Sequence, residues 1–362
     1  MIKKAIQYFF AIFLLFFSYP ARAQHKKQAT QMRQYTADHS FFQYTGRVDF
    51  SNKKLPRYWN PGVYVTARFA GNQCEIVVND EVAKNKNHNQ LEIQIDKNKP
   101  YKILLQEKIN RIVIDAGAKQ SVHTIVICKN TESIMGYVEF AGLRCNVLLA
   151  PPAKPFRKIE FIGNSITCGT GSDVSAIPCG KGGWQDQHNA YLSYGPLTAR
   201  KLQAQWMLTA VSGIGLVHSC CNLPIIMPQV FDKINLFGDS IVWDAANYQP
   251  DVLTICLGEN DGIQDSSIFC NSYIAFLKNL RLAYPASQII LLNSPMADAS
   301  LNNTLNKFVT AVKKNISKED KKVSTYFFQK RYNHGCDNHP NLQEHQQIAA
   351  ELSRYIKIKM KW

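Results

Sequence analysis

Residues 159–167 read IEFIGNSIT, a short apolar run that ends in a glycine turn and then presents a serine. The same alternation of apolar runs with amphipathic helical stretches continues to the end of the chain. The later apolar runs cover residues 207–211, 252–257, 289–292 and 323–328, and the helical stretches about 191–205, 267–282, 301–316 and 342–358. This repetition predicts a parallel sheet with helices on both faces. The loops that carry functional residues are expected at the carboxyl ends of its strands. We expect an α/β domain over residues 156–362.

The preceding part of the chain has a different pattern. Short β-rich runs alternate with polar turns from about residue 41 to residue 150, without helical periodicity. Turn signals such as Ala70-Gly71-Asn72 separate the runs, which cover residues 62–69, 74–78, 91–95, 101–105, 111–114, 123–128 and 137–140. We expect an antiparallel β-sandwich of jelly-roll type over residues 24–150. Residues 151–155 (PPAKP) cannot continue a paired central strand and are expected to be a linker.

The N-terminus has the features of a signal peptide. Lys3 and Lys4 precede an apolar run over residues 5–17, and Ala21-Arg22-Ala23 follows it. This run is shorter than the roughly 20 residues that cross a bilayer. We expect cleavage of residues 1–23, no stable membrane insertion of the mature chain, and a periplasmic or extracellular location.

The composition excludes several other classes of protein. The 362 residues are 46% hydrophobic, which is too apolar for a disordered chain. The net charge is +15, but the lysines are scattered and not interleaved with aromatics, so nucleic-acid binding is not expected. Some of the ten cysteines can be paired in an exported protein, although sequence does not give the connectivity. Cys-x-x-Cys and His-x-x-x-His pairs are absent from the sequence, so no metal or other cofactor is expected.

Four segments place chemically useful residues at strand ends or beside a helix. They contain Ser165, Gly213, Asn260 and His339, in that order along the chain. A hydroxyl beside a base can be a nucleophile, and backbone N–H groups or a side-chain amide can stabilise an oxyanion. Each segment also has a plainer interpretation, namely a helix N-cap serine, two ordinary turns and a polar loop histidine. Their conjunction at the strand ends of one sheet favours a catalytic cleft.

These segments resemble the four blocks of the SGNH (GDSL-type) hydrolases. The blocks are Gly163-Asn164-Ser165-Ile166, Ser212-Gly213, Gly258-Glu259-Asn260-Asp261 and Asp337-Asn338-His339-Pro340-Asn341. With the β-rich part in front, the resemblance narrows to carbohydrate esterase family 2, supported by residues 46–49, 69–71 and 189–195. The resemblance implies that Ser165 is the nucleophile and His339 the general base. It also implies an oxyanion hole made of the N–H groups of Ser165 and Gly213 and the side chain of Asn260.

Two features depart from the family pattern. Position 164 is Asn where Asp is usual, and the usual acidic partner, three residues before the histidine, is replaced by Cys336. Asp337 is a possible third catalytic residue, but the family also contains Ser–His dyads in which a backbone carbonyl orients the histidine. Residues 237–241 (FGDSI) read closer to the GDS signature, but they follow the second block, so Ser240 is not expected to be the nucleophile.

The substrate implied by this resemblance is an acetylated polysaccharide or oligosaccharide. Sugars present apolar C–H faces, so an aromatic platform is expected in the cleft. Trp184, Tyr191 and Trp243 are candidates because they lie near the blocks, although each could instead be a packing residue. The leading hypothesis is a secreted acetyl esterase acting on xylan or glucomannan. An esterase for another acylated glycan, such as peptidoglycan, and a non-catalytic carbohydrate-binding protein remain alternatives, and the oligomeric state is open.

Overall fold

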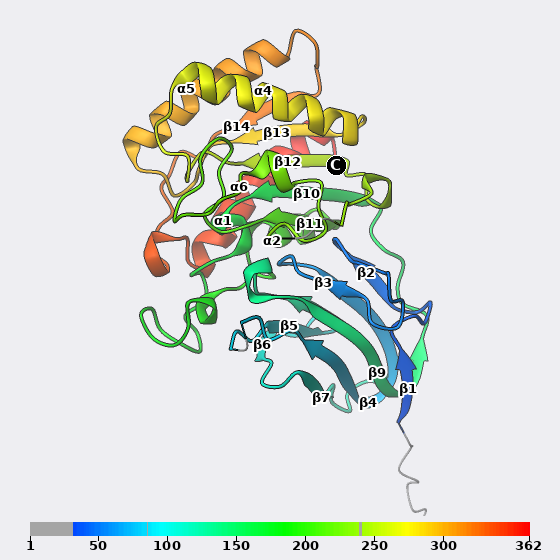
Figure 1. The fold of residues 1–362 in the computed structure, drawn as a ribbon. Coiled ribbons are helices and arrows are strands. Elements are labelled where there is room, and N and C mark those ends of the chain that lie inside the picture. Colours follow the sequence, from blue (N-terminus) through cyan, green and yellow to red (C-terminus); the bar gives the residue numbers. More distant parts are fainter. Residues whose placement is uncertain (1–31, 85, 239–240) are drawn as a thin grey trace, which may run out of the picture. The chain divides into compact units, whose positions relative to one another are not determined.

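The computed structural model describes residues 32–84, 86–238 and 241–362 (Figure 1). An antiparallel β region spans Arg33–Leu149, and an α/β region spans Arg157–Met360. Both belong to one compact unit, Met32–Trp362. In this described part of the chain, no helix is both long enough and apolar enough to span a bilayer. The expected signal peptide over residues 1–23 lies outside the described residues, as does Ser240.

The β region is a hydrogen-bonded sheet in which β9, β4, β8 and β5 are the central strands. All of its strand pairs are antiparallel. Its elements are β1 (Arg33–Thr36), β2 (Gln43–Thr45), β3 (Arg57–Tyr58), β4 (Tyr64–Asp80), β5 (Gln90–Ile95), β6 (Tyr101–Leu104), β7 (Ile109–Asp115), β8 (Val122–Lys129), the 3-10 turn η1 (Ser133–Met135) and β9 (Val138–Leu149). An antiparallel β region in front of the α/β region is therefore confirmed.

The predicted turn at Ala70-Gly71-Asn72 is wrong, because these residues continue strand β4. The first half of β4 pairs with β8 and its second half with β7, while β9 pairs with both halves. The register against β9 shifts between Ala70 and Cys74, and Gly71 has a φ of +109°. Glycine permits this conformation, so the strand bulges and bends without reversing its direction.

The α/β region contains a five-stranded parallel sheet in the order β11-β10-β12-β13-β14. Its strands are β10 (Arg157–Gly163), β11 (Ala204–Ala210), β12 (Val252–Cys256), β13 (Gln288–Leu292) and β14 (Val323–Tyr326). Its helices are α1 (Ser165–Cys168), α2 (Tyr194–Lys201), α3 (Met227–Val230), α4 (Ser266–Ala283), α5 (Ala299–Ile316) and α6 (Leu342–Met360), with 3-10 turns η2 (Trp184–Gln187), η3 (Ala245–Asn247) and η4 (Cys336–Asn338). The predicted fold class is confirmed.

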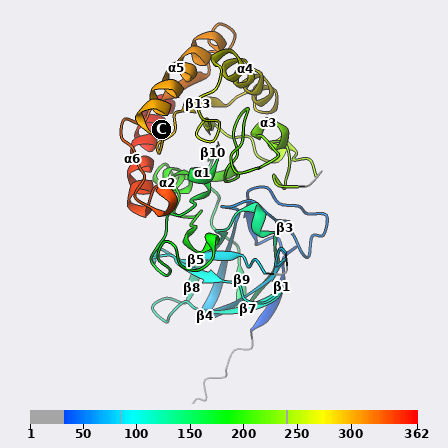
Figure 2. The same cartoon turned by 60° about the vertical axis from the view of Figure 1, so that its left-hand side comes forward.

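Alternate residues of the parallel strands enter two different cores. Ile159 and Phe161 pack with residues of α2 and α6, whereas Ile162 packs with residues of α4 and α5. Figure 2 shows α6 and α2 on one side of the sheet and α4 on the other. Both faces are covered, which explains why β12 is buried along its whole length.

A buried ion pair joins the two regions. Arg47 Nη2 lies 3.1 Å from Glu160 Oε1 on β10, and neither side chain is exposed. Arg47 also donates to the carbonyl oxygens of Phe231 and Lys233, and Glu160 accepts from Thr209 Oγ1 at 2.6 Å. Buried charges are tolerated when such hydrogen bonds compensate for lost hydration. The β region is thereby fixed against the first strand of the parallel sheet.

Candidate active site

The strands that precede the candidate residues end level with one another. Gly163 of β10 pairs with Ala210 of β11 and with Cys256 of β12. The segments that follow these three residues therefore leave the same edge of the sheet. This register brings Ser165, Gly213 and Asn260 together from distant parts of the chain.

Ser165 is the first residue of the short helix α1. The Asn164 side chain accepts a hydrogen bond from the Ile166 N–H at 3.2 Å and so caps this helix. At position 163, a Cβ atom would lie 2.0 Å from Thr167 Oγ1, so the close approach of strand and helix requires glycine. This tight turn presents Ser165 at the end of the strand, with only 6% of its surface exposed.

His339 follows the turn η4 and contacts the serine directly. Its Nε2 atom lies 2.8 Å from Ser165 Oγ, and its Nδ1 atom lies 3.1 Å from the carbonyl oxygen of Cys336. A carbonyl can only accept, so the imidazole carries its proton on Nδ1 and offers the Nε2 lone pair to the serine hydroxyl. Burial lowers the pKa of His339 below its usual value, although the bond to Cys336 opposes this shift. The neutral base is thereby favoured.

The structure does not join Asp337, the possible third catalytic residue, to the imidazole. Asp337 and His339 are both described, and no hydrogen bond joins Asp337 to the imidazole. The carbonyl oxygen of Cys336 instead accepts from both the backbone N–H, at 3.0 Å, and Nδ1 of His339. The tight turn, in which Asp337 has a φ of +51°, brings this carbonyl back to the histidine. The geometry is that of a Ser–His dyad oriented by a backbone carbonyl.

Two further hydrogen-bond donors belong to Gly213 and Asn260. Gly213 has a φ of +83°, and its N–H makes no hydrogen bond to the residues that the structure describes. Asn260 Nδ2 donates to the carbonyl oxygen of Ile214 at 2.9 Å. This bond orients the amide and leaves its second N–H able to donate to a ligand. Together with the first N–H of α1, these groups can donate to an oxyanion.

These residues line one cavity of about 410 Å³, within the range typical of small-molecule sites. Ser165, Gly213, Asn260 and His339 all contribute to its wall, and so does Trp184. The remaining wall is largely apolar and includes Ile134, Leu223, Pro224 and Phe237. The cavity therefore combines a serine hydroxyl in contact with an imidazole and a surface suited to the apolar face of a ligand.

Two disulfides lie at this site. Cys220–Cys221 forms part of the cavity wall. Cys179–Cys336 joins the segment before Trp184 to the turn that holds His339, with 5.3 Å between the Cα atoms. The other described cysteines are free thiols. Cys270 is partly buried, and the rest are buried, namely Cys74, Cys128, Cys145, Cys168 and Cys256.

Comparison with known families accounts for both regions. Residues 44–152 match the carbohydrate esterase 2 N-terminal model, and residues 161–346 match the GDSL-like lipase/acylhydrolase family. The second match alone covers more than half of the chain. The chain belongs to the GDSL-like lipase/acylhydrolase family.

Relatives of this GDSL-like hydrolase include carbohydrate esterases. It is 30% identical to the cellulase/esterase CelE of Acetivibrio thermocellus over 88% of the chain, which spans only 39% of CelE. It is 26% identical to an acetylxylan esterase/glucomannan deacetylase of Cellvibrio japonicus, over 98% of the chain and 99% of that protein. A family two carbohydrate esterase from Clostridium thermocellum, solved with cellohexaose, has a TM-score of 0.81 and 29% identity, over 89% of this chain and 99% of that chain. The resemblance to carbohydrate esterase family 2 is confirmed.

Two of the three expected aromatic platforms of this GDSL-like hydrolase lie elsewhere. Tyr191 is 2% exposed, and its hydroxyl donates to Gln94. Trp243 is 9% exposed and packs in a separate cluster with Trp59. Their positions near the blocks in sequence do not place them in the cavity, because both rings are needed for packing. Trp184, 44% exposed, does line the cavity.

The sequence reasoning missed the polar residues behind the cavity. Glu132, from the β region, contacts Thr170, His188 and Ser212. Its position in a polar turn between two β-rich runs resembled an ordinary loop, and only the packing of the two regions reveals its partners. Among the described residues, no group of three or more His, Cys, Asp or Glu could hold a metal ion.

Proposed function

We propose that this protein is an exported serine esterase that removes O-acetyl groups from plant cell-wall polysaccharides such as xylan or glucomannan. The proposal depends above all on the 2.8 Å contact between Ser165 Oγ and His339 Nε2, in a cavity that also contains Gly213 and Asn260. The named activity of the Cellvibrio japonicus relative supports the substrate class. The N-terminal sequence supports export.

The proposed reaction begins with attack of Ser165 Oγ on the ester carbonyl carbon. His339 Nε2 takes the serine proton as the new C–O bond forms, and the imidazolium is stabilised by the Cys336 carbonyl on Nδ1. Negative charge develops on the carbonyl oxygen, where the N–H groups of Ser165 and Gly213 and the Asn260 amide donate to it. Collapse of this intermediate breaks the bond to the sugar oxygen, which leaves with the proton from His339.

Hydrolysis of the acetyl-enzyme repeats these steps with water. His339 takes a proton from the water as its oxygen attacks the acetyl carbon, and then returns a proton to Ser165 Oγ as acetate leaves. Trp184 offers an exposed ring at the same cavity, on which the apolar face of a sugar can lie.

The test is acetate release from acetylated xylan, glucomannan and O-acetylated peptidoglycan, with Ser165→Ala beside the unmodified protein. We expect release from a plant polysaccharide and a loss of about 10⁴-fold or more in kcat for the variant. Release from peptidoglycan alone would replace the proposed substrate. Glycan binding without release from any of the three would identify a binding protein built on an esterase scaffold.

A further inference from the structure

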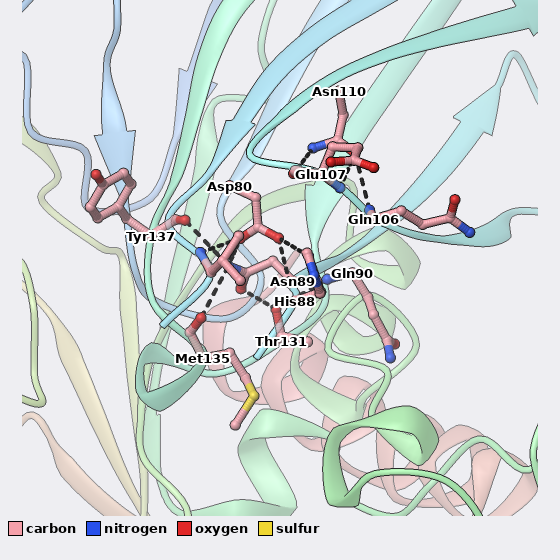
Figure 3. A network of polar contacts seen from close by, with 11 residues as sticks. Asp80, His88, Asn89, Gln90, Gln106, Glu107, Asn110, Thr131, Met135 and Tyr137 are labelled. Carbon is pink, nitrogen blue, oxygen red and sulfur yellow. Dashed lines mark hydrogen bonds and ion pairs between the residues drawn. The ribbon is translucent and has the colours of Figure 1, made fainter. Parts of the chain in front are cut away.

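The segment between β8 and β9 brings a carboxylate of the β region to the catalytic cavity. This segment is held firmly at its start, because Lys129 Nζ donates to the carbonyl oxygens of Thr131 at 2.7 Å and Glu132 at 3.1 Å. Thr131 Oγ1 donates to Asn89 Oδ1 at 2.6 Å. Asn89 Nδ2 donates to the carbonyl oxygens of residues 135 and 137, so the network drawn in Figure 3 brackets Glu132 on both sides.

Glu132 directs its carboxylate at the loop that carries Gly213. Its Oε2 atom accepts the Ser212 N–H at 2.8 Å, and its Oε1 atom accepts the Ser212 hydroxyl and Thr170 Oγ1, the latter at 2.8 Å. Ser212 directly precedes Gly213, and both residues line the cavity. Glu132 thus holds Ser212 at its N–H and at its hydroxyl, and the orientation of the Ser212–Gly213 peptide that follows depends on how this residue is fixed.

The same carboxylate supports the aromatic wall. Glu132 Oε1 lies 3.2 Å from His188 Nε2, and both side chains are buried. The Trp184 ring packs edge-to-face on His188 with 4.3 Å between ring centroids. One side chain thus lies behind both the oxyanion side of the cavity and its exposed tryptophan.

The carboxylate remains charged in this position. Burial by itself raises the pKa of a carboxyl group, but the contacts with His188 and Ser212 lower the pKa of Glu132 to about 2. An ionised carboxylate accepts at every lone pair, which matches the set of donors around it.

We propose that Glu132, a residue of the β region, is a positioning residue of the active site that fixes Ser212, and through it the N–H of Gly213 for oxyanion binding, and that supports Trp184 through His188. This inference rests on the proposed esterase function. It assigns the β region a part in the reaction, because the α/β region supplies the reacting groups while a side chain of the β region sets their geometry.

The test is the variant Glu132→Gln, which keeps the shape of the side chain. Its amide nitrogen cannot accept, so one of the donors, the Ser212 N–H or the hydroxyls, loses its partner. With 4-nitrophenyl acetate we expect kcat to fall about 10- to 10²-fold while KM stays within about twofold, because the oxyanion forms only in the transition state. With acetylated polysaccharide, KM should also rise because Trp184 loses its support.

Glu139→Gln is the matched control. Glu139 is another buried carboxylate of the β region, paired with Arg57 at 2.6 Å and outside the cavity. Its variant should retain the kcat of the unmodified protein. Hydrogen exchange of residues 210–215 gives a readout independent of activity, and it should accelerate in Glu132→Gln but not in Glu139→Gln.

The outcomes separate the inference from the proposed function. If Ser165→Ala is inactive but folded Glu132→Gln keeps full kcat and normal exchange, Glu132 is not a positioning residue and the esterase assignment stands. If the unmodified protein releases no acetate, the esterase assignment fails, and the exchange of residues 210–215 still shows whether Glu132 holds this loop.

Discussion

Two loops beside Ser165 are held in place by different means. One is the histidine turn, which carries Cys336 and His339, and the other is the oxyanion loop, which follows β11 and carries Ser212 and Gly213. The histidine turn is tied covalently by Cys179–Cys336, and the Cys336 N–H donates to the carbonyl oxygen of Gly171 at 2.8 Å. The oxyanion loop has no disulfide to another part of the described chain. Buried carboxylates hold it instead, with Glu132 on Ser212 and Asp261 accepting from the N–H groups of residues 216, 217 and 218.

This difference matches the different role proposed for each loop. The histidine must keep one distance to Ser165 while protons move in both directions, and a backbone carbonyl on a tethered turn provides a fixed partner. The oxyanion loop must present N–H groups to a charge that exists only briefly, and this requires that its backbone donors be aimed in advance. The disulfide and the carboxylate contacts can each be removed separately by mutation.

Asn260→Ala should reduce kcat more than the other variants described below. It leaves the Cys179–Cys336 disulfide and the contacts of Glu132 intact. The variant removes one oxyanion donor, and such losses typically cost about 10²–10³-fold in kcat. The measurement is kcat with 4-nitrophenyl acetate, with Asn247→Ala, at an exposed position in η3, as the control. A loss below about threefold would mean that Asn260 only braces the carbonyl of Ile214.

Removing the Cys179–Cys336 disulfide should have an intermediate effect on catalysis. For Cys179→Ser/Cys336→Ser we expect the free energy of unfolding to fall by about 2–4 kcal/mol. We also expect kcat/KM to fall roughly tenfold because the Cys336 carbonyl is less well fixed, and a misplacement of 1 Å can cost up to about 10²-fold. Denaturant unfolding and kinetics test both expectations.

Cys270→Ser provides the control for this variant, since Cys270 is a free thiol on α4. It should change neither quantity appreciably. If the double variant loses stability but keeps its full kcat/KM below the unfolding transition, the disulfide is a structural link and does not position His339.

Asp337→Asn should have the smallest effect, with kcat/KM changing less than about twofold. The carboxylate makes no hydrogen bond to the imidazole in the described part of the chain, and its charge is the smallest of the influences that raise the pKa of His339. Removing this charge should therefore leave the pKa below its usual value. Because His339 is proposed to act in its neutral form, kcat/KM should fall on the acid side only as pH drops through a pKa below the usual value of about 6.5. A tenfold loss, or a clear displacement of this acid limb, would restore Asp337 to the catalytic group.

The sequence predicted the parts of the molecule that depend on local pattern. Alternating apolar runs and helical stretches located the parallel sheet, and the order of the four segments placed Ser165 and His339 in one cavity. The turn at residues 70–72 was wrong because tertiary pairing with β9 on both sides overrides a local turn signal. Tyr191 and Trp243 were misplaced because nearness in sequence does not determine which face of an element a ring occupies.

The groups that orient the reacting side chains were harder to predict from the sequence. Glu132 lies 80 residues from Ser212, and sequence gives no sign of their pairing. The carbonyl of Cys336 has no side-chain signal at all, since any residue supplies the same backbone oxygen. Sequence patterns therefore identified the reacting side chains better than the groups that aim them.

The Cys179–Cys336 bond has a further consequence for a protein proposed to work outside the cell. It links residues 157 positions apart, so a covalent loop encloses most of the parallel sheet. A protease that cuts once at any exposed site between these cysteines leaves two chains, one with Ser165 and the other with His339. The disulfide keeps the two chains in a single molecule, so one cut need not separate the proposed nucleophile from its proposed base.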